Sequence, residues 1–169
     1  ESGCLISASR GGGCFMEPIE EAPGAATSPY RCRTATLASV AEARLCSPVF
    51  FSNVGAAGGV AERLGLSAPP LRMRSQAKYA ALARGDADVY LRVYVEGSEW
   101  RELAWDHAAG ALAVEEAGGM VTDATGRPLR FTGARLLGCT GGVVAAGSPK
   151  LHAAVMEALR DSGAIVHDE

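Results

Sequence analysis

Polar and apolar positions change their period several times along this chain, and each change predicts a new element. Short apolar runs at Cys4–Ser9 and Cys14–Glu17 flank three consecutive glycines, which predicts a β-hairpin. The stretch Glu20–Pro29, rich in Pro, Gly and Ala, predicts a connector and a domain boundary. Arg31–Val40 alternates basic or hydroxyl residues with apolar ones, which predicts a half-exposed strand.

Downstream of the connector, helical and strand-like patterns alternate. Ser75 is predicted to cap a helix that stops at Gly85, and Ser148 is predicted to cap a final amphipathic helix. The other predicted elements are a helix at Gly59–Leu66, strands at Leu71–Met73, Val89–Val95, Met120–Thr122, Arg130–Phe131 and Thr140–Ala146, and a helix from Asp106 to Gly118. Such alternation is typical of an α/β layered domain without internal repeats.

Composition narrows the class of protein. The chain has 169 residues, 48% of them apolar and 21% charged, which suits one globular domain or one domain plus a fragment. A net charge of −3 argues against a nucleic-acid partner, which usually requires a basic stripe. No apolar run approaches the roughly 18 residues of a membrane span, so we expect no membrane partner. We expect a monomer.

The cysteines give an indication of compartment. There are five, and no two of them stand at the C-x-x-C spacing that zinc sites and redox motifs use. This pattern favours free thiols in a reducing compartment over a disulfide framework. We therefore expect a cytoplasmic or organellar location.

Asp106 is the strongest candidate for chemistry, because it lies where a strand-like segment meets a helix. A carboxylate in that position either caps the helix or holds a metal or a metal-bridged phosphate. From local spacing, capping is the commoner role, since no His or Cys cluster surrounds it. His107 is a weaker candidate for a general base, because its side chain should point away from that of Asp106.

Two further groups are suited to binding an anion. Ser75 and Lys78 lie three residues apart at a predicted helix start, where free backbone N–H groups favour phosphate; the alternative is a cap and a solvated lysine. Arg92, on one strand face with Tyr90 and Tyr94, can clamp a phosphate while a ring covers a base or sugar. The alternative for Arg92 is an exposed strand face.

Other polar and aromatic residues are predicted to have ordinary structural roles. Trp105 is expected to be a packing residue, and Glu115 and Glu116 are expected to be helix surface. His152 and His167, in the last helix and tail, are expected to be solvated.

The stretch Trp105-Asp106-His107-Ala108-Ala109-Gly110, with Glu116-Ala117-Gly118-Gly119 and Thr122-Asp123, resembles a known signature. It is similar to the C-terminal signature of the lithium-sensitive, magnesium-dependent phosphomonoesterases related to inositol monophosphatase. Upstream, Ser75–Tyr79 and Ala87–Arg92 resemble one branch of that superfamily, the 3′(2′),5′-bisphosphate nucleotidases. The similarity covers nearly the whole chain.

The resemblance implies an α/β layered sandwich of the α-β-α-β-α phosphatase type, with a mixed sheet flanked by helices. It also implies that the chain is a fragment, the C-terminal half of an enzyme. The Asp-Pro-Ile-Asp-Gly-Thr segment, which supplies metal ligands in the family, does not occur in these residues. Residues 1–28 are then the last strands of an N-terminal metal-binding domain plus connector, and residues 29–169 a C-terminal α/β domain.

The activity that the resemblance implies is Mg²⁺-dependent removal of the 3′-phosphate from 3′-phosphoadenosine 5′-phosphate, giving AMP. The sulfated nucleotide and inositol 1,4-bisphosphate are further candidate substrates. By resemblance, Ser75, Lys78 and Arg92 contact the nucleotide, and Asp106 is the catalytic residue, binding both metal and the substrate sugar.

Two alternatives to this activity stay open: an inositol monophosphatase, and a non-catalytic nucleotide-binding fragment. The nucleotidases usually carry a histidine between the positions of Pro48 and Gly59, and this chain has none there. The superfamily is therefore better supported by the sequence than the branch.

Overall fold

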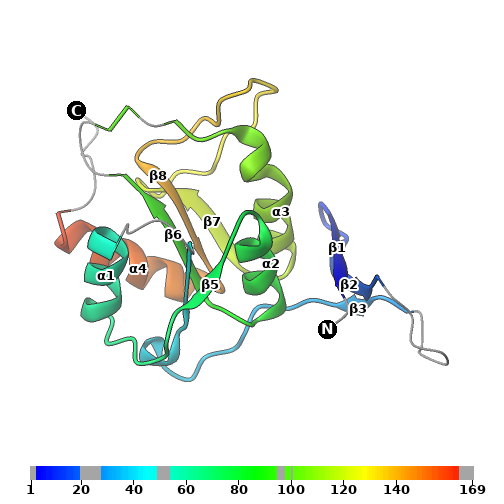
Figure 1. Ribbon diagram of the computed structural model, residues 1–169, viewed down its shortest axis with the longest axis horizontal. Coiled ribbons are helices and arrows are strands. Elements are labelled where there is room, and N and C mark those ends of the chain that lie inside the picture. The colour runs from blue at the N-terminus through cyan, green and yellow to red at the C-terminus, as the bar shows by residue number, and fades with distance from the viewer. Residues whose placement is uncertain (1–2, 20–27, 49–53, 95–97, 100, 164–169) are drawn as a thin grey trace.

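The computed structural model describes residues 3–19, 28–48, 54–94, 98–99 and 101–163, which form two β-sheets and four α-helices (Figure 1). The predicted connector Glu20–Pro29 lies largely outside the described residues, as do Val95 and His167. None of the described helices is long and apolar enough to cross a membrane.

The small sheet has the order β1 (Cys4–Ser9), β2 (Gly13–Pro18), β3 (Tyr30–Arg31), and all its strands are antiparallel. The predicted hairpin is confirmed, with Cys4 opposite Pro18 and Ser9 opposite Gly13. The long strand predicted over Arg31–Val40 is wrong, because only its first residue belongs to a strand. The N–H of Thr34 donates instead to the carbonyl of Ala117 at the end of a helix, so this backbone serves a helix terminus.

The large sheet is mixed, and its strand order is β5-β4-β6-β8-β7. β4 runs parallel to both of its neighbours, whereas β8 runs antiparallel to both of its own. The bounds are Leu45–Pro48 for β4, Leu71–Met73 for β5, Val89–Val93 for β6, Met120–Asp123 for β7 and Gly142–Ala146 for β8. The predicted strand at Arg130–Phe131 is wrong, since Arg130 makes only an isolated bridge to Gly138.

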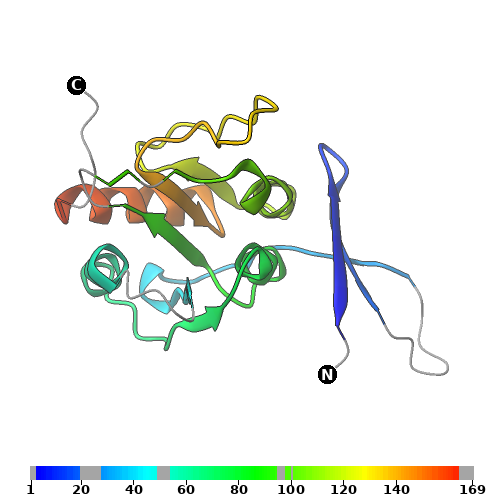
Figure 2. The same cartoon turned by 45° about the horizontal axis from the view of Figure 1, so that its top comes forward.

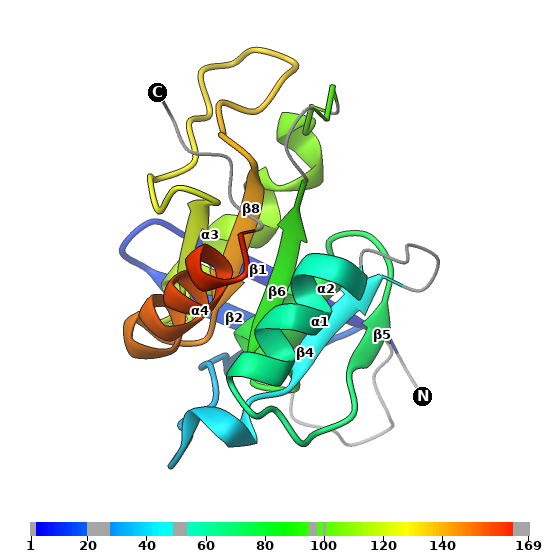
Figure 3. The ribbon, with the colours of Figure 1, turned by 90° about the vertical axis from the view of Figure 1, so that its left-hand side faces the viewer.

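Two pairs of helices cover the two faces of this sheet (Figure 2). α1 (Val54–Arg63) and α4 (Pro149–Asp161) lie on one face, and Figure 3 shows them in front of the strands. α2 (Ala77–Arg84) and α3 (Ala108–Glu116) lie on the other face, between the large sheet and the hairpin. The layers therefore follow the order α-β-α-β, which confirms the layered sandwich with a mixed sheet.

Period-two alternation along β6 sends its side chains into separate cores. Val89, Leu91 and Val93 belong to the core beneath α1 and α4, whereas Tyr90 belongs to the core beneath α2 and α3. The same alternation places Arg92 on the strand face of Tyr90, as the sequence predicts, and that face is the α2/α3 side of the sheet. The fold thereby places the Arg92 guanidinium on the side of the sheet that α2 and α3 cover.

Two of the predicted helix ends are confirmed, and a third is wrong. The Ser148 hydroxyl accepts the N–H of Leu151 at 3.1 Å and caps α4, and Gly85 ends α2 with φ +79°. Ser75 does not cap α2: it has φ +53°, and Gln76 occupies the N-cap position. Ser75 thus stands one residue before the N-cap, in a left-handed conformation that few non-glycine residues adopt.

α2 and α3 approach each other closely at Gly110. A Cβ at that position would lie 2.4 Å from the Cδ2 atom of Tyr79, so only glycine permits this packing. The ring of Tyr79 is almost fully buried, at 1% exposure. The two helices are therefore fixed against each other where both of them begin.

Glu116 joins the hairpin to α3, contrary to its predicted role as ordinary helix surface. Its Oε1 accepts the N–H of Gly11 at 2.7 Å, and its Oε2 accepts the N–H of Gly13 at 2.9 Å. Both glycines have positive φ, which turns their N–H groups toward one carboxylate. These hydrogen bonds lower the pKa of Glu116 below its ordinary value. We call this contact the Glu116 clasp.

Two other predictions about single residues are wrong. His152 is buried rather than solvated, and its Nε2 lies 2.8 Å from the hydroxyl of Thr122 on β7. Trp105 is 55% exposed rather than packed inside, with the Arg135 guanidinium 5.7 Å from its ring centroid. In both cases the neighbour that decides the environment lies about 30 residues away in the chain.

Candidate active site

The predicted site residues come from three segments that meet on the α2/α3 side of the large sheet. Ser75 and Lys78 lie at the start of α2, Arg92 lies near the end of β6, and Asp106 lies in the turn before α3. Electrostatic coupling joins three of them, because the charges of Arg92 and Asp106 both act on the ammonium of Lys78.

Gln76 ties the start of α2 to the turn that carries Asp106. Its Nε2 donates to the carbonyl of Trp105 at 2.8 Å, and its Oε1 accepts the N–H of Gly110 at 2.7 Å. One side-chain amide therefore holds the backbone on both sides of Asp106. No local pattern marks Gln76 as a site residue, although it stands inside the Ser75–Tyr79 motif.

Asp106 is exposed and belongs to a 3-10 turn, Ala104–Asp106. The N-cap position of α3 is occupied by His107, whose side chain makes no capping hydrogen bond. The capping alternative for Asp106 is therefore wrong. Its charge acts on the ammonium of Lys78, and its side chain does not occupy the N-cap position of α3.

Lys78 is buried rather than solvated, at 6% exposure. Its Nζ donates to the carbonyl of Ser75 at 2.7 Å and lies 5.1 Å from the centroid of the Tyr90 ring. Burial lowers the pKa of Lys78, and the nearby carboxylates of Asp106 and Glu102 oppose that shift. A buried ammonium is costly without a partner, so this position is suited to an anion.

Arg92 is held by an ion pair that no local sequence pattern predicts. Its Nε donates to Oε1 of Glu102 at 2.7 Å, and also lies 3.1 Å from the Tyr94 hydroxyl. The exposed-face alternative for Arg92 is wrong, since 20% of its side chain is exposed. Of the two flanking rings, Tyr90 is 2% exposed and packs edge-on against Tyr79, which leaves Tyr94 beside the guanidinium.

Glu102 connects Arg92 to a buried histidine. Its Oε2 lies 2.9 Å from Nε2 of His107, whose Nδ1 lies 2.6 Å from the hydroxyl of Tyr79. Burial raises the pKa of Glu102, but hydrogen bonds from His107 and Arg92 outweigh it, so the pKa lies below its ordinary value. Both ring nitrogens of His107 have hydrogen-bond partners inside the protein. This agrees with the expectation that His107 is a weaker candidate for a general base.

The described residues do not form a metal site by themselves. Within that part of the chain, no three His, Cys, Asp or Glu side chains lie close enough together to hold an ion. Magnesium in proteins takes about six oxygen ligands, and Asp106 offers one carboxylate. All five cysteines are free thiols, as the sequence predicts.

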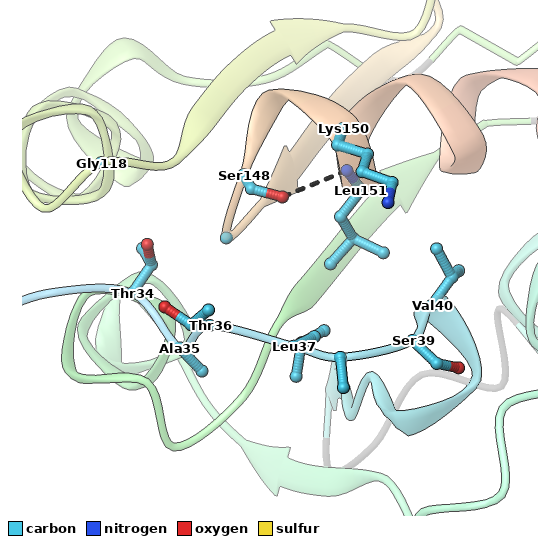
Figure 4. Close-up of a pocket in the computed structure, with 12 residues that line it drawn as sticks. Thr34, Ala35, Thr36, Leu37, Ser39, Val40, Gly118, Ser148, Lys150 and Leu151 are labelled. Atoms are coloured by element: carbon cyan, nitrogen blue, oxygen red, sulfur yellow. Dashed lines mark hydrogen bonds between the residues drawn. The ribbon is translucent and has the colours of Figure 1, made fainter.

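A separate pocket lies on the other end of the sheet (Figure 4). It has a volume of about 350 Å³ and lies between residues 34–40 and the start of α4, beside Ser148, Lys150 and Leu151. None of the predicted site residues lines it. The candidate site is therefore distinct from this cavity.

The fold and the site together agree with a family assignment. The chain matches the inositol monophosphatase family over residues 2–164, and it belongs to that family. It is 40% identical over 161 residues to the probable 3′(2′),5′-bisphosphate nucleotidase 4 of Arabidopsis thaliana, covering 95% of this chain and 45% of that protein. It is 41% identical over 147 residues to a 3′(2′),5′-bisphosphate nucleotidase of Emericella nidulans, covering 86% and 41%. The chain thus spans less than half the length of these curated relatives.

Solved structures support the fold. CysQ of Bacteroides thetaiotaomicron, a bacterial member of the family, superposes with a TM-score of 0.65 at 20% identity, covering 86% of this chain and 54% of that one. SuhB of Mycobacterium tuberculosis gives a TM-score of 0.63 at 24% identity, covering 96% and 56%. These likenesses confirm the phosphatase-type layered architecture.

Proposed function

We propose that the complete protein carrying this chain is a phosphomonoesterase that removes the 3′-phosphate of 3′-phosphoadenosine 5′-phosphate and releases AMP. The observation that carries the proposal is the presence in one site of two desolvated cations, Lys78 and Arg92, and an exposed carboxylate, Asp106, whose charge acts on Lys78. The names of the relatives supply the substrate class. The sulfated nucleotide and inositol 1,4-bisphosphate are further proposed substrates.

The two cations favour a substrate with two phosphates. An inositol monophosphate offers one phosphate, which the metal ions of the complete site would bind, so it would bring no further anionic group to Lys78 and Arg92. A bisphosphate brings a second group for them, and Arg92 is suited to it because a guanidinium can bind phosphate in a bidentate manner. A non-catalytic nucleotide-binding protein is the alternative if the complete protein lacks metal ligands.

Mg²⁺ is the proposed cofactor of the complete protein. Asp106 would supply one ligand, and the others would come from outside the described residues, which do not form a metal site. When bound, the ion would supply Lewis acidity toward the phosphate. The proposal includes a monomeric protein in the cytoplasm or an organelle, with no nucleic-acid or membrane partner.

The test compares substrates that differ by one phosphate. In the complete protein, we expect Lys78→Ala and Arg92→Ala to raise KM for adenosine 3′,5′-bisphosphate about ten- to a hundredfold, because a charge-assisted contact contributes roughly 1.5–3 kcal/mol. Turnover of adenosine 3′-monophosphate should change little. Arg92→Ala should have the larger effect, because lysine offers only a point charge.

Lys150→Ala is the matched control, because Lys150 is an exposed lysine at the start of α4. It should leave both substrates unaffected. Equal losses on both substrates in the Lys78 and Arg92 variants would mean that these side chains serve the cleaved phosphate or the fold. No loss on either would contradict the proposed binding role.

A further inference from the structure

We propose that Glu102, His107 and Tyr79 are positioning residues that hold the Arg92 guanidinium in the orientation the second phosphate requires. The inference rests on the proposed function, in which Arg92 binds that phosphate. It concerns three residues that do not themselves face the ligand.

The four side chains form one continuous series of hydrogen bonds. Tyr79 Oη lies 2.6 Å from His107 Nδ1, His107 Nε2 lies 2.9 Å from Glu102 Oε2, and Glu102 Oε1 lies 2.7 Å from Arg92 Nε. The side chains of Glu102 and His107 are 3% and 2% exposed, and that of Arg92 is 20% exposed. The series therefore runs from the core outward and ends at the guanidinium.

One proton arrangement satisfies every group. With Glu102 ionised and His107 protonated on Nε2, Tyr79 donates to Nδ1, the histidine donates to Oε2, and Arg92 donates to Oε1. Each carboxylate oxygen thus receives one donor. Glutamine at position 102 keeps an acceptor oxygen but carries no negative charge, so it would replace the charge-assisted hydrogen bond to Arg92 with a weaker neutral one.

The series fixes an orientation as well as a position. The Nε–H bond lies in the plane of the guanidinium, so a donor bond from Nε to a buried carboxylate sets the tilt of that plane. The Tyr79 ring cannot yield, because it is packed against Gly110 on α3 and edge-on to Tyr90 on β6. Well-packed apolar side chains would stabilise the core at least as well as a buried ion pair. Stability alone therefore does not explain these buried polar groups, which favours a positioning role.

A double-mutant cycle in the complete protein tests the coupling. We expect Glu102→Gln to raise KM for adenosine 3′,5′-bisphosphate about tenfold, with kcat within twofold and adenosine 3′-monophosphate unaffected. Adding Glu102→Gln to Arg92→Ala should change KM no further. Tyr79→Phe, which keeps the packing, should give a smaller increase of the same selectivity. Glu157→Gln, an exposed carboxylate on α4, is the control and should leave KM unchanged.

The Arg92 Nε–H signal in ¹⁵N NMR spectra gives a readout that needs no turnover. Glu102→Gln should speed its exchange with water at least severalfold, and Glu157→Gln should leave it unchanged. Additive KM effects in the double variant, or an unchanged exchange rate, would overturn the inference while leaving the proposed function intact. If the wild-type protein releases no phosphate from the bisphosphate, the proposed function fails, and the exchange rate alone decides the positioning role.

Discussion

Asp106 is not the N-cap of α3, so a substitution that removes its charge breaks no capping hydrogen bond. We expect Asp106→Asn in the complete protein to lower Mg²⁺-dependent kcat by orders of magnitude, because the amide cannot replace an anionic ligand. Stability should change by less than about 0.5 kcal/mol, as for other exposed positions. Phosphate release and urea unfolding measure the two effects. Asp161→Asn, at the exposed end of α4, is the control.

Activity within a few-fold of wild type in Asp106→Asn would show that this residue is no metal ligand. A large loss of stability would contradict the observation that it caps no helix.

Single residues also show where sequence reasoning ends. The motifs of this chain predict Ser75, Lys78, Arg92 and Asp106, and the structure brings their segments together. The contacts of these residues could not be predicted, because Glu102 reaches Arg92 across 10 positions and Gln76 reaches Gly110 across 34. Nothing in the local pattern around Glu102 indicates a buried carboxylate.

At the scale of elements, the Glu116 clasp predicts a pH-dependent contribution to stability. Hydrogen bonds from Gly11 and Gly13 lower the pKa of Glu116 in the folded state, below an unfolded value near 4.5. The clasp therefore stabilises the fold fully above that pH and is lost as pH falls through the lower, folded pKa. We expect Glu116→Gln to lower the free energy of unfolding at pH 7, with a difference from wild type that shrinks at pH 3.

Urea unfolding at the two pH values measures this effect, with Glu157→Gln as the exposed control. A difference that stays the same at pH 3 would mean that the charge of Glu116 has no part in holding the hairpin.

The contact between α4 and β7 predicts a second pH effect. Burial lowers the pKa of His152 below 6.5, so the folded protein favours the neutral ring. Its contribution is fully present above pH 6.5 and is lost as pH falls toward the folded pKa, because the unfolded chain binds the proton first. Urea unfolding between pH 5 and 8 should show this loss, and His152→Gln should flatten it. Parallel pH profiles would contradict the prediction.

Elements with strong local signals agree with the sequence, and one with a weak signal does not. The hairpin at Gly11–Gly13, the cap at Ser148 and the stop at Gly85 each have a local physical cause, and all three are confirmed. The alternation over Arg31–Val40 has no such support, and its N–H at Thr34 is bound by the end of α3. A period of two predicts which residues can face inward, but not whether a neighbouring strand is present.

At the scale of the molecule, the described residues do not form a metal site by themselves. Its described residues hold no cluster of three possible ligands, and the chain covers 45% of its Arabidopsis thaliana relative. We expect the purified 169-residue chain to hydrolyse neither bisphosphate nucleotide nor inositol monophosphate at a useful rate, because one Asp cannot hold cations that each want about six oxygens.

Phosphate release with and without Mg²⁺ checks this expectation, with the complete protein as the reference. A rate for the chain close to that of ordinary enzymes would contradict it.

The attachment of Gln76 to both Trp105 and Gly110 has a consequence for motion. Because Gly110 also meets the Tyr79 ring, α2 and α3 cannot separate without breaking two hydrogen bonds and a close packing contact together. A hinge motion of α2 against α3 would therefore break these contacts, so it is not the means by which this site binds a ligand. If the proposed function holds, a nucleotide would meet Lys78 and Asp106 already at their final separation, and recognition on this side would be by fit to a rigid frame.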